Sequence, residues 1–333
     1  MANHSISLLS AKLPKKTLGA AAAAVGTKIY VFGGHDGSSY INTIRVFDTT
    51  DETVTTLSTT LPQPAGYMGV ATVGTRVFLA GGWTIGSEQL NKIFVFDASD
   101  NSIRTVAAKL PEAADGMAAA AVGSNIYIFG GQNVNKISVL DTTINALTTL
   151  STTLPRRSLY NMPAVTVGTK IYLFGGSSNS DFDENMIQVF DTTDNSLTTL
   201  SATLPEGATN MGVGMIGSKI YLFGGYYGTL SKLLNTIIEF DPDTNAIATL
   251  DTVLPQGMEF MGSASANTKI YLFGGRNGNG DPQNSIYVFG RINTDTKPVY
   301  LRKNGEWVKR GYYTRSEYAT MNLLLIWLLS LFD

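Results

Sequence analysis

The chain has 333 residues, of which 44% are hydrophobic and 15% are charged, and its formal net charge is −2. It contains no cysteine and only two histidines, which excludes a disulfide framework, a thiol nucleophile, a cysteine-bound metal and a multi-histidine metal site. We expect no metal or other cofactor. The first fourteen residues lack the apolar stretch of a signal peptide, so we expect a cytoplasmic protein or part of a non-secreted assembly such as a virion.

Two short markers repeat along the chain in phase with each other. Gly-Gly pairs stand at 33/34, 81/82, 130/131, 175/176, 224/225 and 274/275, with steps of 45 to 50 residues. Leu-Pro pairs stand at 13/14, 61/62, 110/111, 154/155, 204/205 and 254/255. Repetition at such a period is the signature of a repeat architecture, and the two markers together indicate six units.

Each unit predicts four short strands. The first is rich in small residues, as at 20–25, and the second is an aromatic and β-branched run that ends at the Gly pair, as at 29–32. The third follows an asparagine, as at 44–48. The fourth is threonine-rich, as at 196–200, and stops near Leu-Pro because proline cannot donate to a ladder. Small residues suit innermost strands that converge on an axis.

The repeat predicts an all-β fold, a six-bladed β-propeller of four-stranded antiparallel blades. Blade six leaves the pattern at residue 290 without a threonine-rich strand, and residues 5–14 match residues 53–62 position for position. The N-terminal strand therefore completes blade six and closes the ring, which removes exposed sheet edges. We expect a propeller at 1–290 and a C-terminal tail at 291–333, with blades at 15–62, 63–111, 112–155, 156–205, 206–255, and 256–290 plus 5–14.

A hydrophobic run that ends in Gly-Gly, a loop and an aromatic third strand resemble the kelch repeat over residues 5–290. The chain departs from most kelch units at two positions. The usual tryptophan after the third strand is replaced by Val54, Ile103, Leu147, Leu197 and Ile247. The early-strand histidine of many kelch units is replaced by Met68, Met117, Met162, Met211 and Met261, with Ala20 in blade one. The chain thus resembles a divergent kelch propeller.

Residues that recur in every blade are interpreted as structural. An asparagine precedes each third strand, where its side-chain amide would tie down loop backbone, and an aspartate begins the turn into the fourth strand, where its side chain would cap the backbone two residues on. These residues are Asn42, Asn91, Asn135, Asn185, Asn235 and Asn284, and Asp48, Asp97, Asp141, Asp191 and Asp241. The recurrent methionines are expected to fill core gaps, with ligand binding as the alternative.

The loops after the Gly pairs and the loops between blades emerge on one face, and they vary in length and content. Variable loops on a rigid scaffold are where recognition is usually placed, and aromatic and arginine side chains anchor interfaces. The sequence therefore predicts a non-enzymatic scaffold that binds a protein or a glycan at this face. The candidate binding residues are His35, Trp83, Tyr67, Arg156, Arg157, Tyr160, Tyr226, Tyr227, Glu259 and Arg276.

Catalysis is the alternative hypothesis, and it comes from the resemblance. Galactose oxidase-like kelch proteins need a cysteine crosslinked to tyrosine, so the absence of cysteine excludes that chemistry. Sialic acid mutarotases are also six-bladed kelch propellers, and Arg156 or Arg157 with Glu259 would allow acid–base work on a sugar at the channel mouth. No catalytic residue is assigned. The acidic run at 181–184 lacks a calcium-loop spacing and is expected to be a solvated loop.

Nucleic acid is not an expected partner, because residues 1–290 carry 17 Lys and Arg against 22 Asp and Glu, without the basic footprint that phosphate binding needs. In the tail, Asn304-Gly305 between residues 298–303 and 306–310 predicts a β-hairpin. The apolar run at 323–332 is too short to span a bilayer. We expect it to dock on a partner or on a second copy, with a weak interfacial anchor as the second interpretation, so that the tail attaches the propeller to a larger assembly.

Overall fold

The structure is a computed structural model that describes residues 4–86, 88–156, 160–178 and 185–291, together with the backbone of two strands in the tail. The chain divides into two compact units, Ile6–Phe289 and Met1–Ser5 with Gly290–Asp333. In the second unit, β31 (Thr296–Lys303) and β32 (Glu306–Thr314) form the predicted antiparallel hairpin. The Asn-Gly turn and the apolar run at 323–332 lie outside the described residues.

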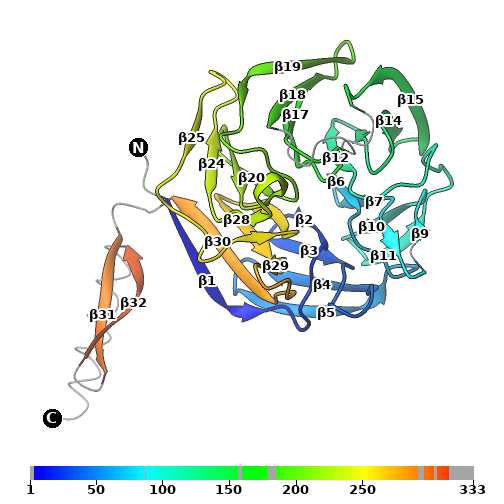
Figure 1. Cartoon of the computed structure of the whole chain (residues 1–333). Helices are drawn as coiled ribbons and strands as arrows, with labels where there is room; N and C mark the ends of the chain where they lie inside the picture. The colour runs from blue at the N-terminus through cyan, green and yellow to red at the C-terminus, as the bar shows by residue number, and fades with distance from the viewer. Residues whose placement is uncertain are drawn as a thin grey trace. The chain divides into compact units, whose positions relative to one another are not determined.

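The first unit is the predicted six-bladed β-propeller of four-stranded antiparallel sheets (Figure 1). From the axis outward, the blades are β2 (Ala21–Val25), β3 (Lys28–Phe32), β4 (Thr43–Asp48), β5 (Thr53–Thr60); β6 (Gly69–Val73), β7 (Arg76–Ala80), β10 (Ile93–Asp97), β11 (Ser102–Thr105); β12 (Ala118–Val122), β13 (Asn125–Phe129), β14 (Lys136–Asp141), β15 (Ala146–Thr153); β16 (Ala164–Val167), β17 (Lys170–Phe174), β18 (Met186–Asp191), β19 (Ser196–Thr203); β20 (Gly212–Ile216), β21 (Lys219–Phe223), β24 (Ile237–Phe240), β25 (Ile247–Thr249); and β27 (Gly262–Ala266), β28 (Lys269–Phe273), β30 (Ser285–Arg291), β1 (His4–Lys12).

The order β27, β28, β30, β1 in the last blade confirms that the N-terminal strand supplies its outer strand. The Leu13 amide continues this join by donating to the Asn284 carbonyl at 2.9 Å. Six apolar clusters fill the spaces between neighbouring blades, and the one between blades six and one contains Leu13, Phe47 and Tyr271. The ring is therefore closed by both a sheet and a core.

The Gly pairs join each blade to the next. The second glycine donates its amide to a carbonyl at the start of the following blade, as from Gly34 to Ala65 at 2.8 Å and from Gly82 to Ala114 at 2.9 Å. The first glycine has a positive φ, and a Cβ on Gly33 would collide with the Ala65 carbonyl oxygen. Only glycine fits a site with this conformation and this close approach, which explains why the pair recurs.

The recurrent polar residues are structural, in partly different ways from the prediction. Each turn aspartate accepts a hydrogen bond from the backbone amide two residues on, as Asp48 does from Thr50 at 2.9 Å. The aspartate pKa values lie below their usual value mainly because of side-chain hydrogen bonds, from Lys219 at Asp241 and from the Thr or Ser two residues on at the other four, and the backbone bonds add to this effect. The repeated asparagines act chiefly through the backbone carbonyl, which accepts the amide of the leucine in Leu-Pro, as Asn42 does from Leu61 at 2.8 Å.

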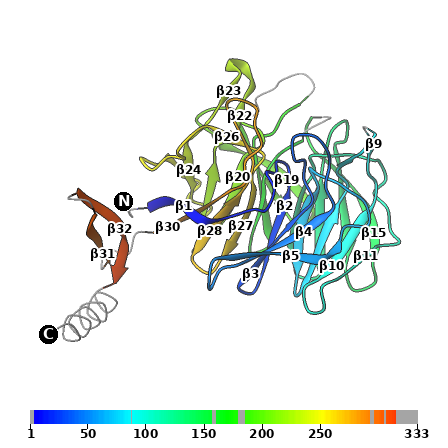
Figure 2. The ribbon, with the colours of Figure 1, turned by 90° about the horizontal axis from the view of Figure 1, so that it is seen from below.

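Small hairpins extend two of the loops that follow the Gly pairs. They are β8 (Trp83–Thr84) with β9 (Glu88–Gln89), and β22 (Tyr226–Tyr227) with β23 (Lys232–Leu233). In blade six, β26 (Met258–Glu259) of the inter-blade loop pairs with β29 (Arg276–Asn277), which follows the Gly pair. Figure 2 shows β9, β22, β23 and β26 at the same end of the propeller. This end is the loop face predicted from the sequence. In the described part of the chain, no helix is long and apolar enough to cross a membrane.

Candidate binding site at the channel mouth

A closed ring of six backbone hydrogen bonds surrounds the axis at the loop face. One residue per blade, immediately before the first strand, donates its amide to the carbonyl of its counterpart in the preceding blade, and Gly19 closes the ring by donating to Phe260 at 3.0 Å. All six residues have the left-handed conformation, with φ between 55° and 64°. We call this set the mouth ring: Gly19, Tyr67, Gly116, Asn161, Asn210 and Phe260.

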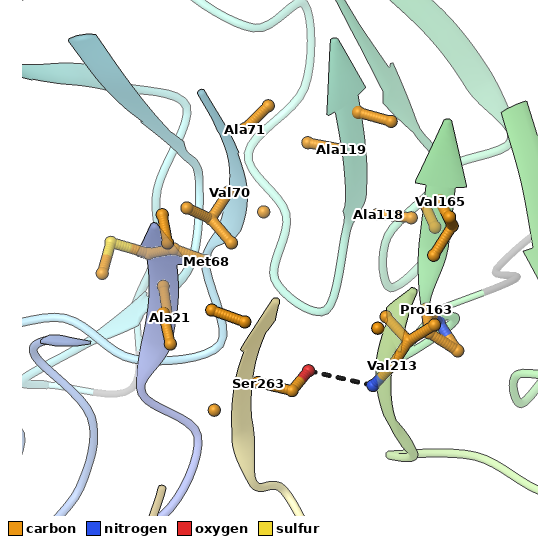
Figure 3. A pocket seen from close by; sticks show the side chains of 18 of the residues that line it. Ala21, Met68, Val70, Ala71, Ala118, Ala119, Pro163, Val165, Val213 and Ser263 are labelled. Atoms are coloured by element: carbon orange, nitrogen blue, oxygen red, sulfur yellow. Dashed lines mark hydrogen bonds between the residues drawn. The ribbon is translucent and has the colours of Figure 1, made fainter. Parts of the chain in front are cut away.

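The mouth ring opens onto a central channel with a volume of about 520 Å³. Its wall consists of the first strands and carries mostly alanine, valine, methionine and glycine, without a charged side chain (Figure 3). Three hydroxyls in the wall bond to the neighbouring blade. Ser263 Oγ accepts the Val213 amide at 2.9 Å, Ser265 Oγ accepts the Met215 amide at 2.8 Å, and Thr166 Oγ1 donates to the Ala121 carbonyl at 2.9 Å. Charged chemistry is therefore confined to the mouth.

The side chains of the mouth ring lie over the glycines of that ring. A Cβ on Gly19 would stand 2.5 Å from Tyr67 Cε1, and a Cβ on Gly116 would collide with Asn161 Oδ1. The Tyr67 ring meets the Phe260 ring edge to face, with centroids 5.0 Å apart. Burial is the main reason that the Tyr67 pKa is raised, and the Tyr40 hydroxyl adds to the effect. Gly19 and Gly116 therefore leave space for the side chains of Tyr67 and Asn161. We call the side chains of Tyr67, Asn161, Asn210 and Phe260 the floor of the mouth.

Around the floor, each blade joins the residue before the mouth ring to the residue after the Gly pair. Five of these joins are antiparallel bridges, and in blade three the Gln132 amide donates to the Asp115 carbonyl at 3.0 Å. The backbone bonds fix both side chains at the rim, independently of their chemistry. We call these the rim pairs: Leu18 with His35, Gly66 with Trp83, Asp115 with Gln132, Tyr160 with Ser177, Thr209 with Tyr226, and Glu259 with Arg276.

The pair in blade six carries an ion pair. Glu259 is 1% exposed, and its Oε1 accepts Arg276 Nε at 2.7 Å and lies 2.6 Å from Arg276 Nη2. Its Oε2 accepts Asn210 Nδ2 at 2.5 Å. The Arg276 guanidinium stands 5.4 Å from the centroid of the Phe260 ring. Both oxygens of the carboxylate are therefore engaged, and the geometry is that of a clasp between blades five and six.

Six of the ten predicted binding residues meet at this mouth as members of the rim pairs: His35, Trp83, Tyr160, Tyr226, Glu259 and Arg276. Tyr67 joins them in the mouth ring. Tyr227 instead packs beside the core between blades four and five, and Arg156 is an exposed residue of an inter-blade loop. Arg157 and the acidic run at 181–184 lie outside the described residues. The guanidinium beside Glu259 is that of Arg276, whereas the sequence suggested Arg156 or Arg157.

Several mouth residues were missed as candidates. Tyr40, Gln89, Asp115, Asn161 and Asn210 were not among the candidates, and four of these five residues are neither aromatic nor arginine, the types that guided the selection. The signal that would have found the mouth ring is positional, since each member stands one residue before the recurrent methionine or, in blade one, before Ala20. Within the described residues, no group of three or more His, Asp or Glu is arranged to hold a metal ion.

Comparison with known proteins agrees with this architecture. A family model described as the KLHDC2/KLHL20/DRC7 Kelch-repeats domain matches residues 68–246, which is more than half of the chain. A second, the Kelch motif, matches residues 16–60 and 260–289. No curated protein matches the chain. The chain belongs to the kelch-repeat family.

Proposed function

We propose that this kelch propeller is a non-enzymatic recognition module that binds a protein partner through the channel mouth and the surrounding loop face. Kelch propellers typically mediate protein interactions. The observation that carries the proposal is the set of six rim pairs, because they hold differing side chains in equivalent positions on a rigid frame. Variable side chains on a fixed backbone are the usual basis of recognition.

The surface around the mouth has the composition of an interface. Trp83, Tyr226 and Arg276 are half-buried at the rim, and aromatic and arginine side chains supply most of the energy at interface centres. Ile85 and Leu230 are 60% and 65% exposed in the hairpin loops of blades two and five. Such exposed apolar side chains beside an aromatic rim suit a protein surface. A glycan is the alternative ligand, since aromatic faces also stack on sugars.

The test is a protein-array and glycan-array screen of the full chain and of variants. The double variant Trp83→Ala/Tyr226→Ala should lose its partner by at least tenfold, because truncation of an anchoring aromatic costs about 2 kcal/mol or more. Ile144→Ala is the control, because Ile144 is 71% exposed in the turn between a third and a fourth strand, at the opposite face.

Three results decide between the ligands. Protein capture that the rim variant loses and the control keeps supports the proposal, and capture confined to glycans replaces the protein partner with a sugar. Capture that the rim variant retains contradicts the site assignment. The mutarotase alternative is addressed by an anomer-interconversion assay on sialic acid, and accelerated interconversion would contradict the non-enzymatic proposal. Attachment of the propeller to an assembly by the tail stays a separate prediction.

A further inference from the structure

Among the residues that the structure describes, one negative charge at the mouth has no cationic partner. Of the twelve residues in the rim pairs, those that carry a formal charge are Asp115, Glu259 and Arg276, and the last two neutralise each other. Asp115 is half-buried, and its Oδ1 accepts a hydrogen bond from Gln89 Nε2 at 2.7 Å. Within the described part of the chain, no lysine, arginine or histidine pairs with it.

The Asp115 carboxylate is held in place by a neutral group. Gln89 Nε2 also donates to Gln132 Oε1 at 2.8 Å, so one amide links the carboxylate to the side chain of its rim partner. Burial raises the pKa of Asp115, and the bond from Gln89 only opposes this effect. The Gln89 amide orients the Asp115 carboxylate but does not neutralise its charge. A cation bound beside Asp115 would therefore stabilise the charged form, which burial disfavours.

Two tyrosine rings stand beside this charge. The Gly116 amide donates to the Tyr67 carbonyl at 3.0 Å, which places Asp115 next to Tyr67 in the neighbouring blade. The Tyr67 ring lies 6.3 Å from the Tyr40 ring at an angle of 74°. Tyr40 lies over Gly66, where a Cβ would stand 3.2 Å from its Cε1. Burial is the main cause that raises the pKa of both tyrosines. The Asp115 charge is the second cause at Tyr40. At Tyr67 it is the smallest contribution, after those of Tyr40, Arg276 and Glu259, and the Arg276 charge acts in the opposite direction.

The described residues on the other side of the mouth carry no free positive charge. Arg276 gives Nε and Nη2 to Glu259 and lies over the Phe260 ring. The described part of the mouth therefore combines a carboxylate that has no cationic partner there with aromatic rings, and both features attract cations. An anionic group beside Asp115 would be repelled by the carboxylate and by the faces of the rings.

We propose that Asp115, Tyr40 and Tyr67 form a pocket for an organic cation, namely the ammonium or guanidinium group of a lysine or arginine side chain on the protein partner. This inference rests on the proposed function and deepens it, because it names the chemistry of the residue that the mouth receives. The carboxylate supplies the countercharge, the two rings supply π faces, and Gln89 keeps the carboxylate oriented.

The test titrates the full chain with n-butylammonium and n-butylguanidinium, with 1-pentanol as an uncharged probe of similar size. Chemical shifts of ¹³C-labelled tyrosine rings report on Tyr40 and Tyr67. Both cations should give saturable shifts at these two rings, and 1-pentanol should give much smaller ones. Asp115→Asn keeps an oxygen that accepts the Gln89 bond but removes the charge, so cation affinity should fall about fivefold to tenfold, as the loss of roughly 1 kcal/mol implies.

Matched variants separate the charge from the fold. Glu112→Gln removes an exposed carboxylate from the same inter-blade loop and should leave cation binding unchanged. Tyr67→Leu keeps Asp115 and removes a π face, so it should also weaken binding, which provides an independent readout if Asp115→Asn disturbs the fold. Equal shifts with 1-pentanol, unchanged affinity in Asp115→Asn, or no saturable shift with either cation would each overturn the proposal.

The same variants distinguish this inference from the proposed function. A protein captured on the array that Trp83→Ala/Tyr226→Ala loses and Asp115→Asn binds normally would refute the cation pocket and leave protein recognition standing. Saturable cation binding that depends on Asp115, without any captured protein, would support the pocket and refute the protein partner.

Discussion

At the scale of single residues, the mouth ring requires a left-handed backbone conformation at all six of its positions. Four of its six members are not glycine, yet all have left-handed backbone, which bulky residues such as Tyr67 and Phe260 rarely adopt. Each strained residue donates and accepts one bond of the closed ring, so the six hydrogen bonds offset the conformational cost. The two glycines have a different role, because the side chains of Tyr67 and Asn161 occupy the space above them.

Gly19→Ala should therefore be more destabilising than a glycine replacement with the same backbone strain. Gly26 is the matched control, because its φ of 62° equals that of Gly19 within a degree and no atom lies within 4 Å of the added Cβ. We expect Gly26→Ala to cost about 1–2 kcal/mol of unfolding free energy and Gly19→Ala to cost about 1–3 kcal/mol more, because Tyr67 must move. Urea denaturation measures the unfolding free energy of both variants. Equal losses in unfolding free energy would contradict the interpretation that Gly19 is required to leave space for the Tyr67 ring.

At the scale of elements, the joints between blades differ in one place. The carbonyl that receives the second glycine belongs to Ala65, Ala114, Ala208 or Met258 at four joints, but to Thr17 at the joint where the chain ends meet. Thr17 is fully buried, and its Oγ1 accepts Arg45 Nη1 at 2.7 Å. Arg45 is 2% exposed, also donates to the Gly33 carbonyl, and its burial lowers its pKa to about 10. A polar clasp thus accompanies the apolar core at the closing joint.

Removal of one partner of this clasp should be worse than removal of both. Thr17→Ala leaves a buried guanidinium nitrogen without its acceptor, and we expect a loss of about 1–3 kcal/mol in unfolding free energy. Thr17→Ala/Arg45→Met, which replaces the polar clasp with an apolar pair, should recover most of that loss. The measurement is a double-mutant cycle by urea denaturation. Additive losses would show that the two side chains are not coupled.

At the scale of the whole molecule, stability depends on closure of the ring. Each blade buries its faces against two neighbours, and β1 supplies the outer strand of blade six from the opposite end of the chain. Without it, β30 would present an unpaired edge and the cluster around Leu13 would lose part of its core. The closure therefore couples the first residues of the propeller to the last.

Deletion of residues 1–14 should lower the thermal midpoint markedly and increase the hydrodynamic radius, because the ring loses its closing strand. Differential scanning calorimetry and size-exclusion chromatography measure the two effects. A synthetic peptide of residues 4–14, added to the truncated chain, should restore part of the lost stability by pairing with β30. A truncated chain with an unchanged melting transition would refute the closure as a source of stability.

The sequence by itself determined the number of blades, the four strands of each, and the closure by residues 5–14, because these depend on local signals that recur: glycine pairs at positive φ, proline at strand ends, and runs of β-branched residues. Only the tertiary structure decided which residues contact one another at the candidate site. Glu259 meets Arg276, which the sequence did not suggest as its partner, and Asp115 stands beside Tyr67, because the circular arrangement of the blades brings together side chains that differ from one repeat to the next. Such contacts do not repeat with the period of the sequence, whereas the strands and turns of the blades do.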